Sequence, residues 1–402
     1  MGVAGIIVEY NPMHRGHVYL LEQTRQQLGE ESAIVCIMSG DFVQRGDFAL
    51  LRRQARARAA VESGADLVLE LPLPWATASA EGFARGAVET LAATGVCTHL
   101  AFGSECGDAA ALMAAAKALE RDDLTPLLQE ELKRGDSFAA ARTRAVSRLA
   151  GQETAALLES PNNILGVEYC RAMLRCGGAM EPITVRRAGA AHDAPEAKEG
   201  FASASLIRAM LRGGQREEAL SLMAEPMRRA FLEEEAAGRA PVFSDALERA
   251  MLFRLRSMTR EDFAALDEGK EGLSNRLYEA SRTAVSVEEI LAAAKTKRYA
   301  YARLRRMVLW GCLGLRREAL PDSPVYIRPL AANAVGRALL GRMRKEAALP
   351  VLTKSADVRR MGGAAEVLFT AEAAAADLYT LAYPNLSQAG GDTLWKEPLL
   401  RL

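Results

Sequence analysis

Two of the four histidines in this 402-residue chain stand in one tetrapeptide, His14-Arg15-Gly16-His17. The apolar run 3–9 before it is typical of a buried strand, and the residues from Val18 onward have the apolar spacing of a helix. A strand followed by a helix whose first N–H groups are free forms a binding site for phosphates. Two imidazoles there can donate hydrogen bonds to phosphoryl oxygens as charge develops on them. The tetrapeptide therefore predicts a nucleotide site.

A second group of residues that suits phosphates stands about 190 residues later. Ser203 and Ser205 begin a helical segment, and Arg208 follows one turn on. Hydroxyls and a guanidinium in this order suit the β- and γ-phosphates of ATP, although a plain helix cap followed by a surface arginine gives the same pattern. The presence of the histidine pair in the same chain favours the phosphate interpretation.

Other polar residues admit two interpretations each. The pair Asn162-Asn163 either caps the helix that follows it or contacts a nucleotide, and Arg186-Arg187 after a strand is either solvated or functional. The arginines of 52–58 fit the exposed face of a helix. His99 and His192 have no partner at a useful spacing, so we expect structural roles for both.

Short apolar runs alternate with helical patterns through the first half of the chain. After the first run, the predicted strands are 33–38, 66–71, 98–102 and 183–185. This alternation predicts an α/β fold, a Rossmann-like parallel sheet with helices on both faces. Ligands of such sheets bind beyond the carboxyl ends of the strands, where the strand order reverses. Asn11, Ser39, Glu70, Gly103 and Arg186 each follow a predicted strand, so we expect the site at that edge.

The strand patterns stop near residue 215. We therefore expect a catalytic domain at 1–215 and a mainly helical domain at 216–402. Segment 321–329 interrupts the helical pattern as a loop or a short strand, and 383–402 has no clear periodicity. Because the phosphate-facing motifs all precede residue 215, the first half is expected to activate ATP by itself.

Composition limits the class of protein. The 51 basic and 51 acidic residues cancel, so any nucleic acid must bind a local patch. The six cysteines have neither Cys-x-x-Cys spacing nor a histidine partner spacing that suggests zinc. The chain has no basic leader and no apolar run of the roughly 20 residues that would span a bilayer. We expect a cytoplasmic protein with no membrane partner.

One basic stretch departs from this balance. The span 297–306 holds five positive charges and no acid, with Tyr299 and Tyr301 between them. A solvated amphipathic helix is one explanation, and contact with RNA phosphates is the other. The predicted RNA contacts are Lys295, Lys297, Arg298, Arg303 and Arg306.

Longer motifs can be compared with known families. They are Val8–His17, Met38–Gly46, Phe102–Glu105, Pro161–Gly166, Lys295–Tyr299 and Arg303–Met307. Together they resemble the bacterial tRNA(Met) cytidine acetate ligases, members of the HxGH nucleotidyltransferase superfamily, over about residues 1–330. Met13 stands where Phe is usual and Asp41 where Asn or His is usual, and neither departure touches a phosphate contact.

The resemblance implies a function and a set of site residues. It implies that ATP activates acetate to acetyl-adenylate, and that the acetyl group then passes to N4 of the wobble cytidine of elongator tRNA(Met), with release of AMP and pyrophosphate.

 The implied reaction has two steps: ATP and acetate give acetyl-adenylate and pyrophosphate, and the adenylate then acetylates the tRNA and releases AMP. The implied cofactors are ATP and Mg²⁺, with the metal shared between the phosphates. His14 and His17 would be catalytic, 1–215 would be the nucleotidyltransferase-like domain, and 216–402 would bind tRNA. The implied ATP contacts are Ile7, Val8, Glu9, Tyr10, Asn11, Pro12, Met13, His14, Arg15, Gly16, His17, Val18, Tyr19, Leu20, Gly103, Asn162 or Asn163, Arg186 or Arg187, Ser203, Ser205 and Arg208.

Two other classes of function fit the same residues. An adenylyltransferase that acts on a small metabolite would use the same histidines, but it would leave about 190 helical residues without a purpose. A catalytically silent RNA-binding protein could share the scaffold, although the intact His14, Gly16, His17 and Arg208 count against lost catalysis. The acyl acid, the tRNA and the oligomeric state stay open at this point.

Overall fold

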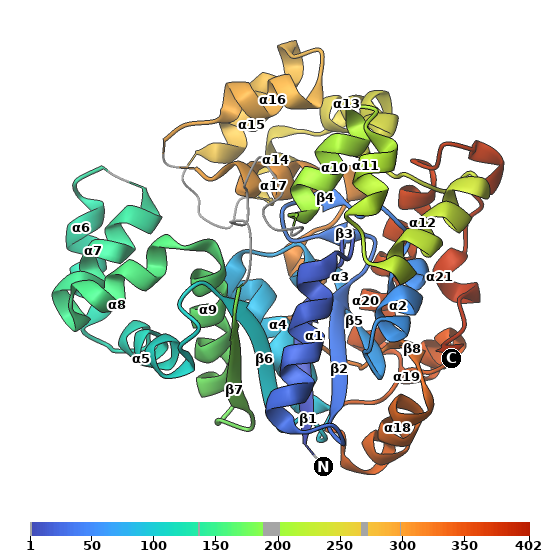
Figure 1. The fold of residues 1–402 in the computed structure, drawn as a ribbon. Helices are drawn as coiled ribbons and strands as arrows, with labels where there is room; N and C mark the ends of the chain where they lie inside the picture. The colour runs from blue at the N-terminus through green and yellow to red at the C-terminus, as the bar shows by residue number, and fades with distance from the viewer. Residues whose placement is uncertain (1, 136, 188–201, 267–271, 298) are drawn as a thin grey trace.

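A seven-stranded sheet runs through the centre of the computed structural model, which describes residues 2–135, 137–187, 202–266, 272–297 and 299–402 (Figure 1). In spatial order its strands are β7 (Glu181–Arg186), β6 (His99–Ser104), β1 (Val3–Val8), β2 (Ala33–Ser39), β5 (Leu67–Leu71), β8 (Pro329–Ala332) and β9 (Leu400–Arg401). All neighbours are parallel except β5 and β8. The chain proceeds from β1 toward β2 on one side and later toward β6 on the other, so the strand order reverses at β1.

Each face of the sheet carries its own hydrophobic core. In β2, Val35 and Ile37 join one core, while Ile34, Cys36 and Met38 join the other, because alternate strand residues point to opposite faces. The first core includes α4 (Ala80–Ala93) and α9 (Pro161–Arg175), and the second includes α1 (Arg15–Leu28), α2 (Arg53–Glu62) and α12 (Glu225–Ala236). The predicted α/β sheet with helices on both faces is confirmed.

The remaining helices form two groups around the sheet in Figure 1. Beside β7 lie α5 (Ala109–Leu119), α6 (Leu124–Leu132), α7 (Phe138–Ala150) and α8 (Gln152–Ala156). Above the sheet lie α10 (Ala204–Arg212), α11 (Arg216–Ser221), α13 (Glu248–Ser257), α14 (Arg260–Ala264), α15 (Leu273–Thr283), α16 (Val287–Ala294) and α17 (Tyr301–Leu313). Helices α13 to α17 share a separate core, which includes Leu255, Phe263 and Leu304. Among the described residues, no helix is long and apolar enough to cross a membrane.

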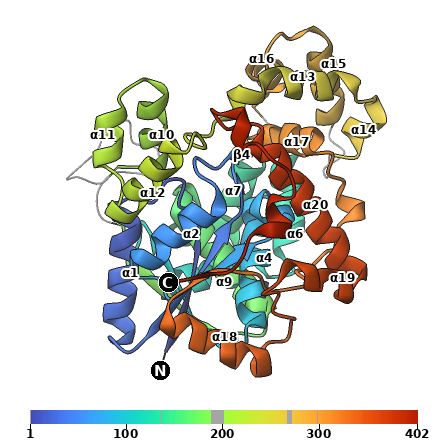
Figure 2. The same ribbon diagram turned by 90° about the vertical axis from the view of Figure 1, so that its right-hand side faces the viewer.

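The end of the chain returns to the sheet, whereas the sequence indicated at most a loop or a short strand at 321–329 and no clear pattern at 383–402. Strand β8 pairs with β5, β9 pairs with β8, and the helices between them lie on the same side of the molecule (Figure 2). These helices are α18 (Ala334–Glu346), α19 (Val358–Met361), α20 (Gly363–Thr380) and α21 (Thr393–Lys396). All four residues of β8 are buried, so the strand has no alternating pattern that sequence analysis could detect.

Arg53 and Arg56 of the arginine-rich helix α2 are buried, which corrects the expectation of an exposed face for them, whereas Arg52 and Arg58 stay partly exposed. Arg53 donates a hydrogen bond of 2.8 Å to Glu70 and also pairs with Asp41. Arg56 donates to the backbone carbonyl oxygens of Glu9 at 2.6 Å and Ser39 at 3.1 Å. These carbonyl groups lie where β1 and β2 end, and a buried carbonyl needs a donor. The two guanidiniums therefore bind together the loops at the carboxyl edge of the sheet.

Candidate active site

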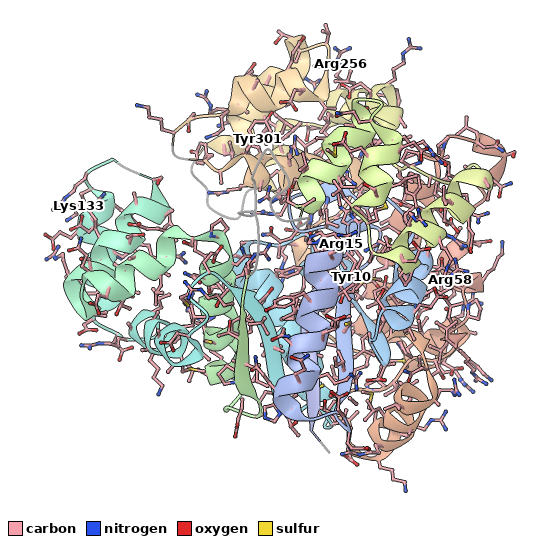
Figure 3. The ribbon with its side chains drawn as sticks, in the orientation of Figure 1. Tyr10, Arg15, Arg58, Lys133, Arg256 and Tyr301 are labelled. Carbon is pink, nitrogen blue, oxygen red and sulfur yellow. The ribbon has the colours of Figure 1, made fainter. Side chains whose placement is uncertain are left out.

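A cavity of about 660 Å³ opens beyond the carboxyl ends of β1 and β6, with the start of α1 on one wall and α10 and α17 contributing to its lining. Figure 3 shows Tyr10 and Arg15 at this end of α1, below Tyr301 of α17. The cavity brings together most of the residues that the sequence singled out. Those lining it are Ile7, Val8, Glu9, Tyr10, Asn11, His14, Gly16, His17, Tyr19, Leu20, Gly103, Asn162, Arg186, Arg187, Ser203, Ser205 and Arg208.

The two histidines are oriented by the start of α1. His14 is the N-cap, and its Nδ1 accepts a hydrogen bond of 3.1 Å from the Gly16 N–H. The Nδ1 of His17 accepts one of 3.2 Å from the His14 N–H, and the two rings stack with their centroids 3.8 Å apart. An imidazole nitrogen that accepts a hydrogen bond carries no proton, so the proton of each neutral ring is on Nε2. Both rings are thereby prepared as Nε2–H donors.

Arg208 connects helix α10 to the histidine loop. Its Nη1 donates to Asn11 Oδ1 at 3.0 Å and its Nη2 to Asp47 Oδ2 at 2.9 Å. Asn11 Oδ1 also accepts from the Leu50 N–H at 2.7 Å. The Ser203 hydroxyl caps α10 by accepting from the Leu206 N–H at 3.1 Å. The helix cap proposed for Ser203 is therefore present, and the hydroxyl lies in the cavity wall as well.

The opposite side of the cavity is built around Glu105, which sequence analysis did not single out. Its Oε1 accepts from Asn162 Nδ2 at 2.7 Å, and its Oε2 accepts from the Asn163 N–H at 2.7 Å. Arg187 Nη1 donates to Asn162 Oδ1 at 3.4 Å, and burial lowers the pKa of Arg187. Asn163 Oδ1 accepts from the backbone N–H groups of Glu105 and Cys106. Asn162 therefore lines the cavity, whereas Asn163 holds the loop behind it.

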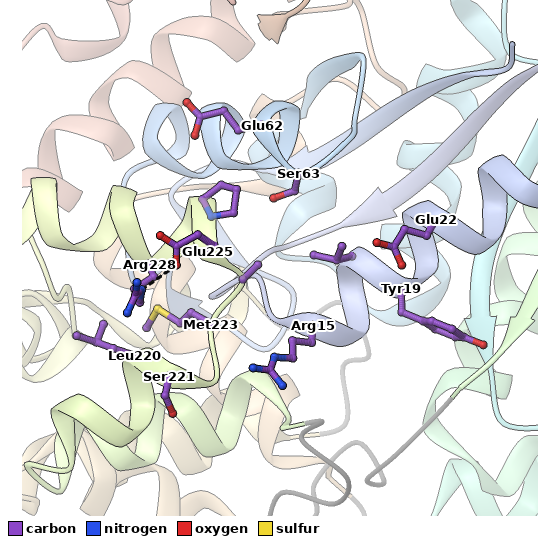
Figure 4. A pocket seen from close by; sticks show the side chains of 13 residues that line it. Arg15, Tyr19, Glu22, Glu62, Ser63, Leu220, Ser221, Met223, Glu225 and Arg228 are labelled. Carbon is purple, nitrogen blue, oxygen red and sulfur yellow. Dashed lines mark hydrogen bonds and ion pairs between the residues drawn. The ribbon is translucent and has the colours of Figure 1, made fainter. Parts of the chain in front are cut away.

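Several predicted ATP contacts lie elsewhere. Arg15 and Val18 line a separate pocket of about 810 Å³ on the other side of α1, where Arg228 bonds to Glu225 (Figure 4). Met13 is fully buried in the core, and its carbonyl oxygen accepts from the Ala224 N–H at 3.1 Å. Pro12 is also absent from the cavity lining. Helix α1 turns Arg15 and Val18 away from the cavity because helical side chains one position apart point in different directions, whereas Pro12 and Met13 lie in the loop before the helix.

Sequence analysis missed the hairpin that covers the cavity. Strands β3 (Phe42–Val43) and β4 (Asp47–Phe48) bring Gln44, Arg45 and Asp47 to its lining. These residues belong to the motif Met38–Gly46, so that motif was the available signal. The lining residues Phe83 and Tyr169 come from distant helices, and no local pattern marks them, whereas Arg305 belongs to the basic stretch 297–306.

Glu9 is a carboxylate of the cavity lining. Its Oε1 accepts a hydrogen bond of 2.7 Å from the Gln44 N–H. Burial raises the pKa of Glu9, and the hydrogen bond to Gln44 opposes that effect. The charges of Arg56, Arg45 and Arg208 also act to lower this pKa. The other cavity carboxylate, Asp47, is paired with Arg208.

The predicted RNA contacts lie in and before α17. Lys295 Nζ donates to the carbonyl oxygens of Thr296 at 2.7 Å and Tyr299 at 2.6 Å, which holds the loop before the helix. Lys297 is exposed, and the guanidinium of Arg303 lies 5.5 Å from the Tyr299 ring centroid. Arg306 Nη1 donates to the Gln44 carbonyl oxygen at 3.2 Å. Two of the early candidates, Arg298 and His192, lie outside the described residues.

Comparison with known proteins agrees with this geometry. The family model described as HIGH Nucleotidyl Transferase matches residues 1–393. A tRNA(Met) cytidine acetate ligase of Acetivibrio thermocellus is 35% identical to the chain over 399 residues, a match that covers 96% of each protein. The chain belongs to the tRNA(Met) cytidine acetate ligase family. The ligase of Thermotoga maritima, a further member, is 35% identical over 407 residues, which cover 96% of this chain and 97% of that protein.

Solved structures place the family fold on the whole chain. The crystal structure of apo Thermotoga maritima TmcAL matches with a TM-score of 0.95 and 34% sequence identity, and the match covers 100% of both chains. The same protein bound with alpha-thio ATP matches with a TM-score of 0.92, 33% identity and the same coverage. The family and fold suggested by the sequence motifs are confirmed.

Proposed function

We propose that the protein activates acetate with ATP and transfers the acetyl group to N4 of the wobble cytidine of elongator tRNA(Met). The observation that carries this proposal is the orientation of His14 and His17, whose Nδ1 atoms accept backbone N–H groups inside a cavity suited to a nucleotide. The full-length likeness to tRNA(Met) cytidine acetate ligases, one of them bound with alpha-thio ATP, supports the substrates.

In the first step, a carboxylate oxygen of acetate attacks the α-phosphorus of ATP. A bond forms between this acetate oxygen and the α-phosphorus. The bond between the α-phosphorus and the oxygen that it shares with the β-phosphorus breaks, and pyrophosphate leaves with that shared oxygen. The Nε2–H groups of His14 and His17 stabilise the charge on the α-phosphoryl oxygens. Ser203, Ser205 and Arg208 hold the departing pyrophosphate, and Gly103, Asn162 and Arg187 hold the adenosine.

In the second step, the cytidine N4 attacks the acetyl carbon, the bond to the adenylate oxygen breaks, and AMP leaves. One N4 proton is lost to the surroundings. The adenylate must be kept from water until the base arrives. The hairpin β3–β4 and helix α17 contribute to the cavity wall, and the loop position of the wobble base allows it to enter a protein pocket.

Mg²⁺ suits this site as a companion of the nucleotide. Magnesium keeps several waters and takes only one or two carboxylates from a protein when it is bound to phosphates. Glu9 fits that role, since Gln44 engages only one of its carboxylate oxygens in the hydrogen bonds described. When bound, the metal would neutralise charge between the phosphates.

The tRNA contacts are proposed on Lys295, Lys297, Arg303 and Arg306, with Arg298 carried over from the sequence motif. An RNA strand that crosses α17 reaches the cavity directly, because Arg305 of the same helix lines it. An adenylyltransferase for a small metabolite would not need this basic helix at the cavity wall. A catalytically silent protein would not need the histidine orientation.

Two measurements test the proposal. Acetate-dependent exchange of labelled pyrophosphate into ATP, without RNA, should report the first step. Mass spectrometry of tRNA nucleosides after incubation with ATP, acetate and bulk tRNA should detect N4-acetylcytidine. If another small acid supports pyrophosphate exchange and acetate does not, that acid replaces acetate in the proposal. If the incubated tRNA contains no N4-acetylcytidine, the second step of the proposal is overturned.

A further inference from the structure

A second cavity, of about 510 Å³, lies between the helices α3 (Leu73–Ala76) and α4 of the catalytic part and the helices α14 and α17. Five of its lining residues are arginines and one is a carboxylate, Glu81. The arginines are Arg85, Arg175, Arg303, Arg306 and Arg317. Glu81 bonds to Arg175 at 2.8 Å, Arg175 also bonds to Glu120 at 2.9 Å, and Arg317 lies 3.8 Å from Asp322. Arginines are nonetheless the main charged side chains of the lining itself. A cavity so charged suits a phosphate group.

The same cavity holds two of the three tryptophans of the chain, Trp75 and Trp310. Trp310 is half-buried, and its Nε1 donates a hydrogen bond of 2.8 Å to Thr77 Oγ1, which orients the indole. Trp75 is 1% exposed and packs closely against Gly86 of α4. Indole rings beside arginines are the combination that binds single-stranded nucleotides, since bases stack on the ring and guanidiniums pair with phosphates.

Gln44 connects this cavity with the catalytic one. Gln44 lines the catalytic cavity, and its carbonyl oxygen accepts from Arg306 Nη1 at 3.2 Å. Its Nε2 donates to the Ala78 carbonyl oxygen at 3.2 Å, and both Arg306 and Ala78 line the second cavity. Helix α17 borders both spaces, with Arg305 in the catalytic lining and Arg303 in the second.

We propose that the second cavity binds a nucleotide of the RNA substrate that neighbours the acetylated cytidine. Its base stacks on Trp310, and its phosphate pairs with Arg303 and Arg317. This inference rests on the proposed function, because it needs an RNA whose modified base enters the catalytic cavity. An acidic protein segment would satisfy the arginines, but the exposed part of Trp310 favours a base.

The binding test uses the full-length protein and a labelled RNA hairpin with the anticodon arm of elongator tRNA(Met). Trp310→Leu should weaken binding about 10-fold or more, which corresponds to the loss of one base–aromatic stack. Trp310→Phe should keep most of the affinity. Both variants lose the hydrogen bond to Thr77, so a difference between them reports the aromatic ring. Arg317→Ala should weaken binding and lower its salt dependence, whereas Arg121→Ala, on the distant loop before α6, should change neither.

Four results would overturn the inference. In the first, preparations that acetylate tRNA bind the hairpin with the same affinity whether they are Trp310→Leu, Arg317→Ala or the unmodified protein. The second cavity would then have no role in RNA binding, while the proposed function would stand. Equal weakening by Trp310→Leu and Trp310→Phe would show that the Thr77 bond matters and the ring does not. If a poly-glutamate peptide with as many negative charges as the unlabelled hairpin displaces the labelled hairpin equally well, the cavity would be assigned to an acidic protein segment. If pyrophosphate exchange is intact but tRNA is not acetylated, RNA is not the acetyl acceptor, and this inference fails together with that part of the proposed function.

Discussion

At the scale of single residues, His17 has two separable roles. Its Nδ1 accepts the His14 N–H, and its Nε2–H is proposed to donate to the α-phosphate. His17→Asn keeps an acceptor near the position of Nδ1 and removes the donor. We expect it to lower acetate-dependent pyrophosphate exchange by about 10²–10³-fold with an unchanged circular dichroism spectrum. Exchange at the unmodified rate would show that Nε2 does not act on the phosphate.

A buried acid gives a second prediction at this scale. Glu372 accepts the Leu73 N–H at 2.8 Å and the Tyr326 hydroxyl, and burial with Glu70 nearby raises its pKa from 4.5 to about 7. Between these two pH values the folded state binds more protons than the unfolded state, so this group makes the unfolding free energy fall as pH rises. Its stabilising contribution is present below about pH 4.5 and lost above about pH 7.

Glu372→Gln mimics the protonated acid and should remove this dependence. In urea unfolding at pH 5 and pH 8, we expect the unmodified protein to lose about 1–3 kcal/mol more than the variant between the two pH values. The comparison of two proteins cancels the other titrating groups. Equal losses in both would mean that Glu372 titrates at its ordinary pKa.

At the scale of elements, the turn of the β3–β4 hairpin lies against the backbone of α17. Gly46 has φ +75°, and an added Cβ would lie 2.6 Å from the Arg306 backbone nitrogen. Gly177 also has φ +75°, but nothing lies within 4 Å of its position. Alanine at either site carries the left-handed strain of about 1–2 kcal/mol, and only Gly46→Ala also pushes the hairpin off the helix.

This pair of variants tests whether the contact matters. We expect Gly46→Ala to lower the unfolding free energy by at least about 1 kcal/mol more than Gly177→Ala in urea titrations. Because the hairpin and α17 both contribute to the proposed tRNA path, Gly46→Ala should also raise the KM for tRNA. If the two variants are equally stable and acetylate tRNA equally well, the hairpin adapts without loss.

At the scale of the whole molecule, the last seventy residues complete the sheet. Strand β8 covers the edge of β5, and Arg328, just before β8, pairs with the buried Glu70. A fragment 1–215 would expose that edge and leave a buried carboxylate with one cation fewer, both of which favour aggregation. We expect the fragment to elute as aggregates in size-exclusion chromatography and to show no pyrophosphate exchange. A monomeric fragment with full exchange would restore the earlier two-domain division.

Local patterns were enough to predict the motifs and most of the sheet. The apolar runs of β1, β2, β5 and β6 are long and continuous, because strands covered on both faces need no polar alternation. The His14–His17 tetrapeptide could be assigned to the start of a helix from its neighbours alone. Both conclusions depend on interactions within a few residues of chain, which a sequence displays directly.

Tertiary structure decided what the sequence could not. Arg53 and Arg56 look like surface residues until Glu70 of β5 supplies a buried carboxylate and the ends of β1 and β2 supply carbonyl oxygens for them. Residues 329–332 form strand β8 because they pair with the edge of β5. Gln44 contacts both cavities because Arg306 of α17 bonds to its carbonyl oxygen. Each of these outcomes depends on a partner distant in the chain, and the partner's position is set by the packing of the whole fold rather than by any local preference.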